Sequence, residues 1–171
     1  GIVDEATYMH YLDLYNEYLA MPRASILDSF DAAYYYRIQN AYFTNYYAAL
    51  DAASGKVVPA TLNETSDNQL WRIEKQANGT ARLVNKANDR YAYVSSSAAD
   101  ATIYANGTAD KAGTAWMPVE ITTDQGAKGI AIVETTGTYS WYTNPNAFPT
   151  IILKPKDWGA SIWNFKKSGI A

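Results

Sequence analysis

Apolar and polar residues follow two different periodicities along this chain, and the change falls near residue 32. Residues 5–22, EATYMHYLDLYNEYLAMP, place apolar side chains at steps of three and four, the spacing of one helical face: Tyr8, Tyr11, Leu12, Tyr15, Tyr18 and Leu19. Pro22 is expected to stop this helix. A second short pattern, SILDSFDAA, begins at Ser25, a suitable N-cap, with Asp28 near the positive helix end. The pattern predicts a helical lead-in segment over residues 1–31, whose aromatic face we expect to pack on the domain that follows.

From Tyr34 onward, short apolar runs alternate with turn sequences such as SGK, NGT, NPN and DWG, which is typical of β-strands. Three stretches read as strand, turn and strand: YRIQNAYFTNYYAAL, ARLVNKANDRYAYV and AIVETTGTYSWY. Each is followed by a further strand candidate (KVVPATL, ATIYAN, TIILKPK) and then by a strand with tryptophan (LWRIEKQ, WMPVEIT, IWNFKKS). The chain therefore repeats a four-stranded unit three times.

The tryptophans of these units stand in matching tripeptides, QLW, TAW and SIW, with spacings of 45 and 47 residues: Trp71, Trp116 and Trp163. Three such units cannot each bury a face alone, but around a pseudo-threefold axis they share one core. The repeats predict a mainly β protein, a β-trefoil over residues 32–171, with repeats at about 34–78, 79–125 and 126–170. We expect the three tryptophans to be structural core residues beneath the barrel.

Composition supports a globular domain with an aromatic surface. Hydrophobic residues make up 48% and charged residues 18% of the chain, so disorder is not indicated. With fifteen tyrosines and five tryptophans, most aromatic rings carry a polar group, which suits strands with one solvent-exposed face or a surface that stacks on a ligand. Residues 1–31 carry a net charge of −5 and the remainder +2, so we expect neither nucleic-acid binding nor membrane insertion.

Groups that would support catalysis are sparse. The chain has no cysteine, and its one histidine, His10, lies in the lead-in segment, so a catalytic triad or a multi-histidine metal site lacks its parts. The acidic residues of the repeats fall singly on strand ends or turns rather than in the pairs that glycosidases use: Glu74, Glu120, Glu134 and Asp157. We therefore expect no enzyme activity, no cofactor and no metal site.

The repeats resemble the ricin B-type β-trefoil, a divergent QxW lectin-like module, over about residues 34–170. Gln69 alone keeps the glutamine of the QxW signature, because Thr114 and Ser161 replace it in the other repeats. The resemblance implies sugar binding in shallow pockets, one for each repeat, by an aspartate of the second strand, an aromatic platform and an asparagine beside the glutamine. Asn68 and Gln69 match the last two of these positions in the first repeat.

The aspartate of that pattern has no match. Aligning YYAAL, RYAYV and TYSWY places Ala49, Tyr93 and Trp141 at its position, and none of them can accept two hydroxyl hydrogen bonds. In the first repeat the segment KVVPATL also offers no ring to stack on, so Asn68 and Gln69 alternatively serve only to cap a strand entry through backbone bonds. Two groups remain as candidate stacking surfaces: Tyr91, Tyr93 and Tyr104 in the second repeat, and Tyr139, Trp141, Tyr142 and Asn144 in the third. Strand alternation sends about half of these rings into the core.

The resemblance thus predicts a non-catalytic carbohydrate-binding module with a glycan or polysaccharide as its partner. We expect the replacement of Trp141 or Tyr93 by alanine to abolish that binding. Because the chain starts at Gly1 without methionine, we expect a processed chain or a fragment, an accessory domain of a larger secreted, periplasmic or cell-surface protein. The alternative is a structural or protein-interaction β-trefoil whose tyrosine-rich helix docks on an adjacent domain of the same parent chain.

Overall fold

The computed structural model describes residues 4–20 and 26–171, and its first element is the predicted helix, α1 (Glu5–Ala20). The Asp4 carboxylate accepts the backbone N–H of Thr7 at 2.8 Å, which satisfies one of the unpaired donors of the first turn. The same hydrogen bond holds the pKa of Asp4 below its usual value. Pro22 and Ser25, the predicted helix stop and N-cap, lie outside the described residues.

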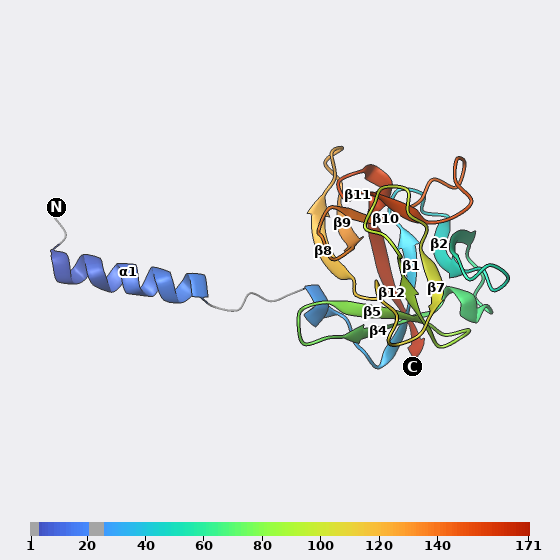
Figure 1. Ribbon diagram of the computed structural model, residues 1–171. Coiled ribbons are helices and arrows are strands. Elements are labelled where there is room, and N and C mark those ends of the chain that lie inside the picture. Colours follow the sequence, from blue (N-terminus) through green and yellow to red (C-terminus); the bar gives the residue numbers. More distant parts are fainter. Residues whose placement is uncertain (1–3, 21–25) are drawn as a thin grey trace.

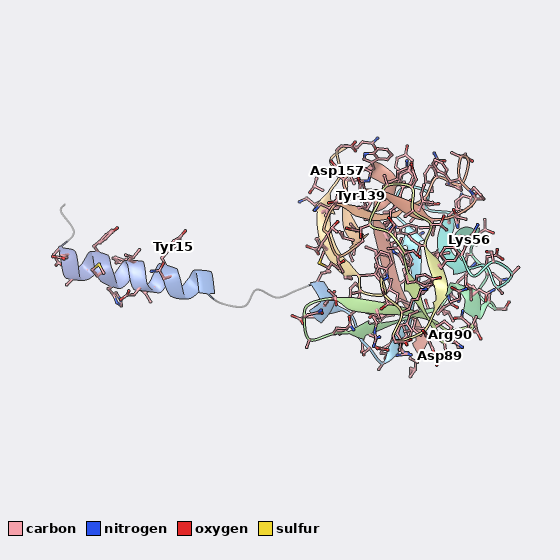
Figure 2. All side chains as sticks on the ribbon, viewed as in Figure 1. Tyr15, Lys56, Asp89, Arg90, Tyr139 and Asp157 are labelled. Carbon is pink, nitrogen blue, oxygen red and sulfur yellow. The ribbon has the colours of Figure 1, made fainter. Side chains whose placement is uncertain are left out.

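The aromatic face of α1 is exposed. Tyr8, Tyr11 and Tyr15 are 59%, 64% and 58% exposed, and α1 lies apart from the β-domain (Figures 1 and 2). The expected packing of this face on the following domain is therefore wrong for these three rings. Tyrosine tolerates this placement because its hydroxyl end keeps its hydrogen bonds to water. No described helix is both long enough and apolar enough to cross a membrane.

The chain reaches the β-domain through a short 3-10 helix, η1 (Ile26–Ser29), where the sequence predicted a second helix. Leu27 and the following Phe30 are buried, so this segment joins the hydrophobic core. Twelve strands follow: β1 (Tyr34–Asn40), β2 (Tyr46–Leu50), β3 (Val57–Thr61), β4 (Trp71–Lys75), β5 (Ala81–Asn85), β6 (Arg90–Tyr93), β7 (Tyr104–Gly107), β8 (Met117–Thr122), β9 (Lys128–Val133), β10 (Tyr139–Tyr142), β11 (Ile152–Pro155) and β12 (Trp163–Ile170). The 3-10 turns η2 (Asp67–Gln69) and η3 (Gly159–Ser161) precede β4 and β12.

The first and fourth strands of the three repeats form a closed barrel. β1 pairs with β12 and β4, β4 pairs with β5, and β9 pairs with β8 and β12, all antiparallel. Between β5 and β8 the circle is completed by Ala81 and Trp116, which exchange two backbone hydrogen bonds of 2.8 Å. Closure leaves no free edge among these six strands.

The remaining strands form three hairpins, β2–β3, β6–β7 and β10–β11, which meet around the threefold axis. Their backbones are joined in a ring, because Val57 N–H donates to Ile103 O, Ile103 N–H to Ile151 O, and Ile151 N–H to Val57 O. Three hairpins linked cyclically below a six-stranded barrel define a β-trefoil. The predicted fold class, three four-stranded repeats with a short N-terminal helical segment, is confirmed.

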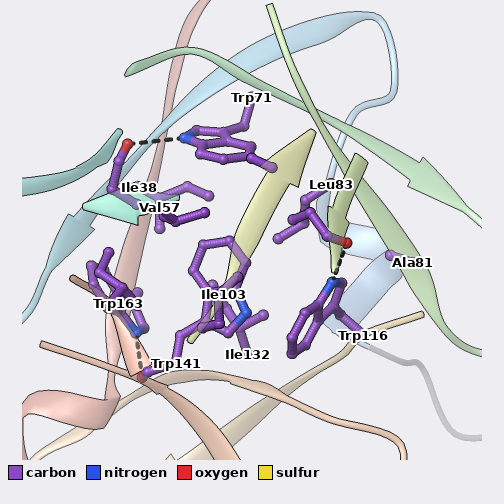
Figure 3. Close-up of a cluster of buried hydrophobic side chains, with 14 of the residues drawn as sticks. Ile38, Val57, Trp71, Ala81, Leu83, Ile103, Trp116, Ile132, Trp141 and Trp163 are labelled. Carbon is purple, nitrogen blue, oxygen red and sulfur yellow. Dashed lines mark hydrogen bonds between the residues drawn. The ribbon is translucent and has the colours of Figure 1, made fainter. Parts of the chain in front are cut away.

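The repeat tryptophans lie in the centre of this fold (Figure 3). Trp71, Trp116 and Trp163 are at most 1% exposed. Each indole N–H donates a 3.0 Å hydrogen bond to a backbone carbonyl of the second strand of its own repeat, those of Ala48, Ala92 and Trp141. Each large ring is thus buried without leaving its one polar group unpaired.

A fourth indole fills the middle of the core. Trp141 is fully buried, and its ring makes edge-on contacts with Trp71 at 5.9 Å and Trp116 at 5.5 Å between centroids. Its positions in the other repeats are Ala48 and Ala92, both fully buried. One indole and two methyl groups therefore occupy the space where the three second strands converge, since interiors are packed too tightly to hold three indoles there.

Candidate functional site

The indole hydrogen bonds also fix which positions of the repeats correspond. Because Ala48, Ala92 and Trp141 accept the same bond, the next residues correspond as well: Ala49, Tyr93 and Tyr142. The expected alignment, which placed Trp141 at the position of the missing aspartate, is wrong by one residue. Trp141 cannot serve as a stacking platform, because it has no exposed surface. Tyr139, also expected near a site, packs partly buried against the hydrophobic core.

In the first repeat, the structure gives Gln69 an internal role. Its side-chain amide donates to Thr61 O at 2.7 Å, and its Oε1 accepts the Asn63 N–H at 3.0 Å, so both ends of this buried group are used. Asn68 bonds through its backbone, whose carbonyl accepts the Asn85 side chain at 2.9 Å. These contacts hold the loop between β3 and β4.

Charged side chains bridge the surface beside this loop. Lys86, from the β5–β6 turn, lies 3.4 Å from the Asp67 carboxylate of η2. The β5–β6 turn belongs to the next repeat, so the ion pair spans the junction between two repeats. The two equivalent junctions, which involve the second and the third repeat, each carry a surface hollow, and these are described next.

In the second repeat, two candidate rings engage each other. Tyr93 and Tyr104 stack with centroids 5.6 Å apart and an interplanar angle of 21°, and the Lys111 ammonium lies 5.0 Å from the Tyr93 centroid. Much of the π-surface of Tyr93 is therefore already in contact with protein groups. A hollow of about 400 Å³ lies beside them, lined by polar and small residues: Val94, Ser95, Ser96, Ser97, Lys111, Ala112, Gly113, Ala115, Glu134 and Thr135.

Tyr91, the third ring of that group, belongs to a separate polar cluster. Its hydroxyl donates to Glu74 at 3.2 Å, and the Arg82 guanidinium lies 4.6 Å above its ring. Glu74 also pairs with Arg82 at 2.6 Å and Arg72 at 3.4 Å. Partial burial, and then the neighbouring Glu74 charge, raise the pKa of Tyr91 above its ordinary value near 10. The arrangement braces β4, β5 and β6 against one another.

The third repeat presents an open aromatic hollow of about 300 Å³, which we call the third-repeat pocket. Its lining comes from four separate parts of the chain: Tyr42, Phe43, Asp124, Gln125, Tyr142, Asn144, Trp158, Gly159 and Ala160. Trp158 is 39% exposed, although Trp is usually well buried, and Tyr42 is 57% exposed. Tyr142 meets the Trp158 ring edge-on at 5.6 Å, which fixes the indole against the wall.

Neighbouring side chains support this indole. The Lys154 ammonium lies 5.4 Å from the centroid of Trp158 and is neutralised by an ion pair with Asp100. Asn144, predicted as a site residue, lies in the lining and accepts the Asn146 N–H through its side-chain oxygen at 3.2 Å. Its amide N–H₂ can donate to a ligand hydroxyl, as the side chain carries two donors.

Another part of the lining comes from the turn between β8 and β9. Asp124 N–H donates to Asp157 O at 2.8 Å, which joins this turn to the loop that carries Trp158. Gly159 allows a close approach, because a Cβ at this position would stand 3.1 Å from the Gln125 side-chain oxygen and 3.5 Å from the Tyr42 ring. The carboxylate of Asp124 is the one charged group among the described lining residues.

A larger hollow, of about 470 Å³, lies along the β8–β9 hairpin. Its described lining contains no aromatic ring: Glu120, Ile121, Thr122, Lys128, Gly129 and Ile130. The smaller third-repeat pocket offers the better chemistry for a sugar, because it combines exposed rings with amide and carboxylate groups. Within residues 4–20 and 26–171, no cluster of metal-binding side chains is found.

Sequence reasoning therefore found Tyr142 and Asn144 but missed the rest of the third-repeat pocket. Trp158 stands five residues before Trp163, where the other repeats have Ser66 and Lys111, so the search for repeats passes over it. Its position in the polar turn DWG was the available signal, since an indole in such a turn has little to pack against.

Comparison with known proteins agrees with this architecture. Residues 28–109 match the family of ricin-type beta-trefoil lectin domain-like proteins. The resemblance predicted from the repeats is thus confirmed over these residues, and the fold is a β-trefoil. No curated protein sequence matches the chain significantly.

Solved structures share this fold at low sequence identity. A Polyporus squamosus lectin, bound to the epitope Neu5Aca2-6Galb1-4GlcNAc, has a TM-score of 0.62 at 23% identity, over 81% of this chain and 50% of its own. The Macrolepiota procera ricin B-like lectin, in complex with lactose, has a TM-score of 0.63 at 13% identity, over 81% and 98%. A Clostridium perfringens endo-β-galactosidase that releases GlcNAcα1-4Gal has a TM-score of 0.61 at 15% identity, over 78% of this chain and 32% of its own. These likenesses describe the fold.

Proposed function

We propose that this chain is a non-catalytic carbohydrate-binding module and that its third-repeat pocket holds the glycan. The observation that carries the proposal is the exposed Trp158 ring, fixed edge-on by Tyr142 at the wall of a hollow that also contains amide groups. An aromatic face stacks on the C–H face of a pyranose, while polar groups at the rim hydrogen-bond its hydroxyls. The ligands named for the two lectin structures are glycans, which supports the same chemistry here.

We further propose that the module serves a larger secreted, periplasmic or cell-surface protein. The endo-β-galactosidase supports this, because this chain covers only 32% of it, so a similar fold occurs there within a longer enzyme. In that role the module supplies binding and the parent protein supplies the reaction, since function belongs to the site rather than the fold.

The test is a glycan array followed by calorimetric titration of the glycans retained. We expect dissociation constants between micromolar and millimolar for the wild type, and loss of binding in Trp158→Ala. Tyr15→Ala, which removes a similarly exposed ring from α1, is the matched control and should bind as the wild type does. If no glycan binds at high protein concentration, or if both variants bind normally, the proposal is wrong.

A further inference from the structure

The lining of the third-repeat pocket includes one acidic residue, Asp124, which does not occupy the second-strand position of the family's aspartate. The aspartate that the ricin-type pattern places on the second strand corresponds here to Tyr142, whose hydroxyl donates one hydrogen bond and cannot replace two carboxylate oxygens. Asp124 stands in the same lining but comes from the β8–β9 turn, outside the repeat's second strand.

The turn that carries Asp124 is held in one conformation by its own hydrogen bonds. Thr123 N–H donates to Ala127 O at 2.8 Å, Gly126 N–H donates to Thr123 O at 3.0 Å, and Ala127 N–H donates to the Thr123 hydroxyl at 3.2 Å. Gly126 has a φ of +83°, which glycine adopts without strain. The turn is thus ordered before a ligand arrives, which lowers the entropic cost of binding.

Contacts with the neighbouring loop direct the turn toward the aromatic wall. The Asp124 N–H reaches Asp157 O, and the Gln125 side chain lies against Gly159, one residue beyond Trp158. Asp124 and Gln125 therefore line the same hollow as the indole, on the turn that is joined to the Trp158 loop. Ligand hydroxyls that extend past the Trp158 ring would meet acceptors on this side.

The corresponding turn between the first and second repeats lacks this group. There Gln76 N–H bonds Thr80 O and Gly79 N–H bonds Gln76 O, the same pattern as Thr123, Ala127 and Gly126. The match places Ala77 where Asp124 stands. Of these two turns, only the β8–β9 turn therefore carries the carboxylate.

We infer that Asp124 takes the place of the missing aspartate, accepting hydroxyl hydrogen bonds from a neutral glycan stacked on Trp158 and excluding glycans with a carboxylate at that position. This inference rests on the proposed function. Its electrostatic part follows from the described lining, in which Asp124 is the one charged residue, while Lys154, which lies against the Trp158 ring, is paired with Asp100. In this hollow a sugar carboxylate beside Asp124 would meet a like charge, which is unfavourable.

The test compares Asp124→Asn with the control Asp157→Asn. The control removes one carboxylate charge from the neighbouring loop, and Asp157 is not among the residues that line the pocket. Lactose, mannotriose and chitotriose serve as neutral probes, and sialyllactose as the carboxylated counterpart of lactose. We expect Asp124→Asn to weaken the best neutral probe by roughly tenfold to a hundredfold, the usual value of a hydrogen bond to a charged group. Asp157→Asn should change it by less than about threefold, a difference of some tenths of a kcal/mol. Asp124→Asn should also lower the ratio of the dissociation constant for sialyllactose to that for lactose.

The outcomes separate the two proposals. Equal binding by both variants, together with loss of binding in Trp158→Ala, would overturn the role of Asp124 and leave the sugar site standing. Tighter binding of sialyllactose than of lactose by the wild type would also overturn it. Failure of the wild type to bind any of these probes would overturn the inference, and failure to bind any glycan of the array as well would overturn the proposed function with it. Thermal melts of both variants ensure that each is folded when it is titrated.

Discussion

Trp163 donates its indole N–H to the carbonyl oxygen of Trp141 at 3.0 Å, so two of the three tryptophans of the third repeat are joined through the backbone of β10. The same bond in the other repeats ends on Ala48 and Ala92. The threefold symmetry of the backbone is thus kept while the side chains at the axis differ. Four of the five tryptophans are therefore buried core residues, whereas Trp158 is 39% exposed.

The first prediction concerns Trp141. Replacing Trp141 with alanine removes a fully buried indole that touches Trp71 and Trp116, so we expect the free energy of unfolding to fall by about 3–5 kcal/mol. Trp158→Ala should change it by less than about 1 kcal/mol, because that ring is partly exposed at the surface. Urea unfolding of both variants measures the difference. Equal losses would contradict the placement of one ring in the core and the other at the surface.

The second prediction concerns Gln69. In Gln69→Ala, the Thr61 carbonyl and the Asn63 N–H lose their partner, so we expect a loss of about 1–3 kcal/mol of stability. Glycan affinity should stay the same, since these bonds lie within the first repeat. Asn68→Ala changes a neighbour that bonds through its backbone and should be milder. A large loss of glycan binding with unchanged stability in Gln69→Ala would show that the glutamine contacts the ligand after all.

The third prediction concerns the pKa of Tyr91, which burial and the Glu74 charge raise. The folded state then holds the phenol proton more tightly than the unfolded state, so this contribution to stability is complete below about pH 10 and is lost as the pH rises through the folded pKa. The difference in phenolate absorbance between the wild type and Tyr91→Phe reports the titration. We expect Glu74→Gln to lower the pKa. An unchanged titration in that variant would exclude the Glu74 contribution.

The fourth prediction concerns α1. A chain without residues 1–25 should keep its melting temperature and its glycan affinity, because the described aromatic rings of α1 are exposed and the core begins with Leu27. Calorimetry and titration of the shortened chain check both quantities. A large drop in melting temperature would show that the helix packs on the β-domain in solution, as its amphipathic pattern alone predicts.

The trefoil itself was predictable because its signals repeat. Trp71, Trp116 and Trp163 recur at nearly equal spacing, and each precedes a strand of similar pattern, so three weak matches support one another. The position of Trp141 was less predictable, since TYSWY can be aligned on either of two registers. The first repeat has one more residue between Asn40 and Ala48 than the second has between Asn85 and Ala92, and only the indole hydrogen bonds resolve the register.

The third-repeat pocket was predictable only in part, because closure of the barrel creates it. Tyr42 belongs to the first repeat and Asp124 to the turn before the third, and they reach the same hollow as Trp158 only when β12 pairs with both β1 and β9. No local pattern encodes that meeting. Internal repeats also do not reveal these residues, because they have no counterparts in the other repeats.

The most direct test of the account uses the five tryptophans themselves as probes. Labelled with fluorotryptophan and assigned by single substitutions, they give one fluorine NMR signal each, which can be followed while a neutral glycan identified by the array is added. The account predicts that the Trp158 signal shifts with saturation while those of Trp71, Trp116, Trp141 and Trp163 stay nearly constant. A glycan that binds and leaves the Trp158 signal unmoved would contradict it.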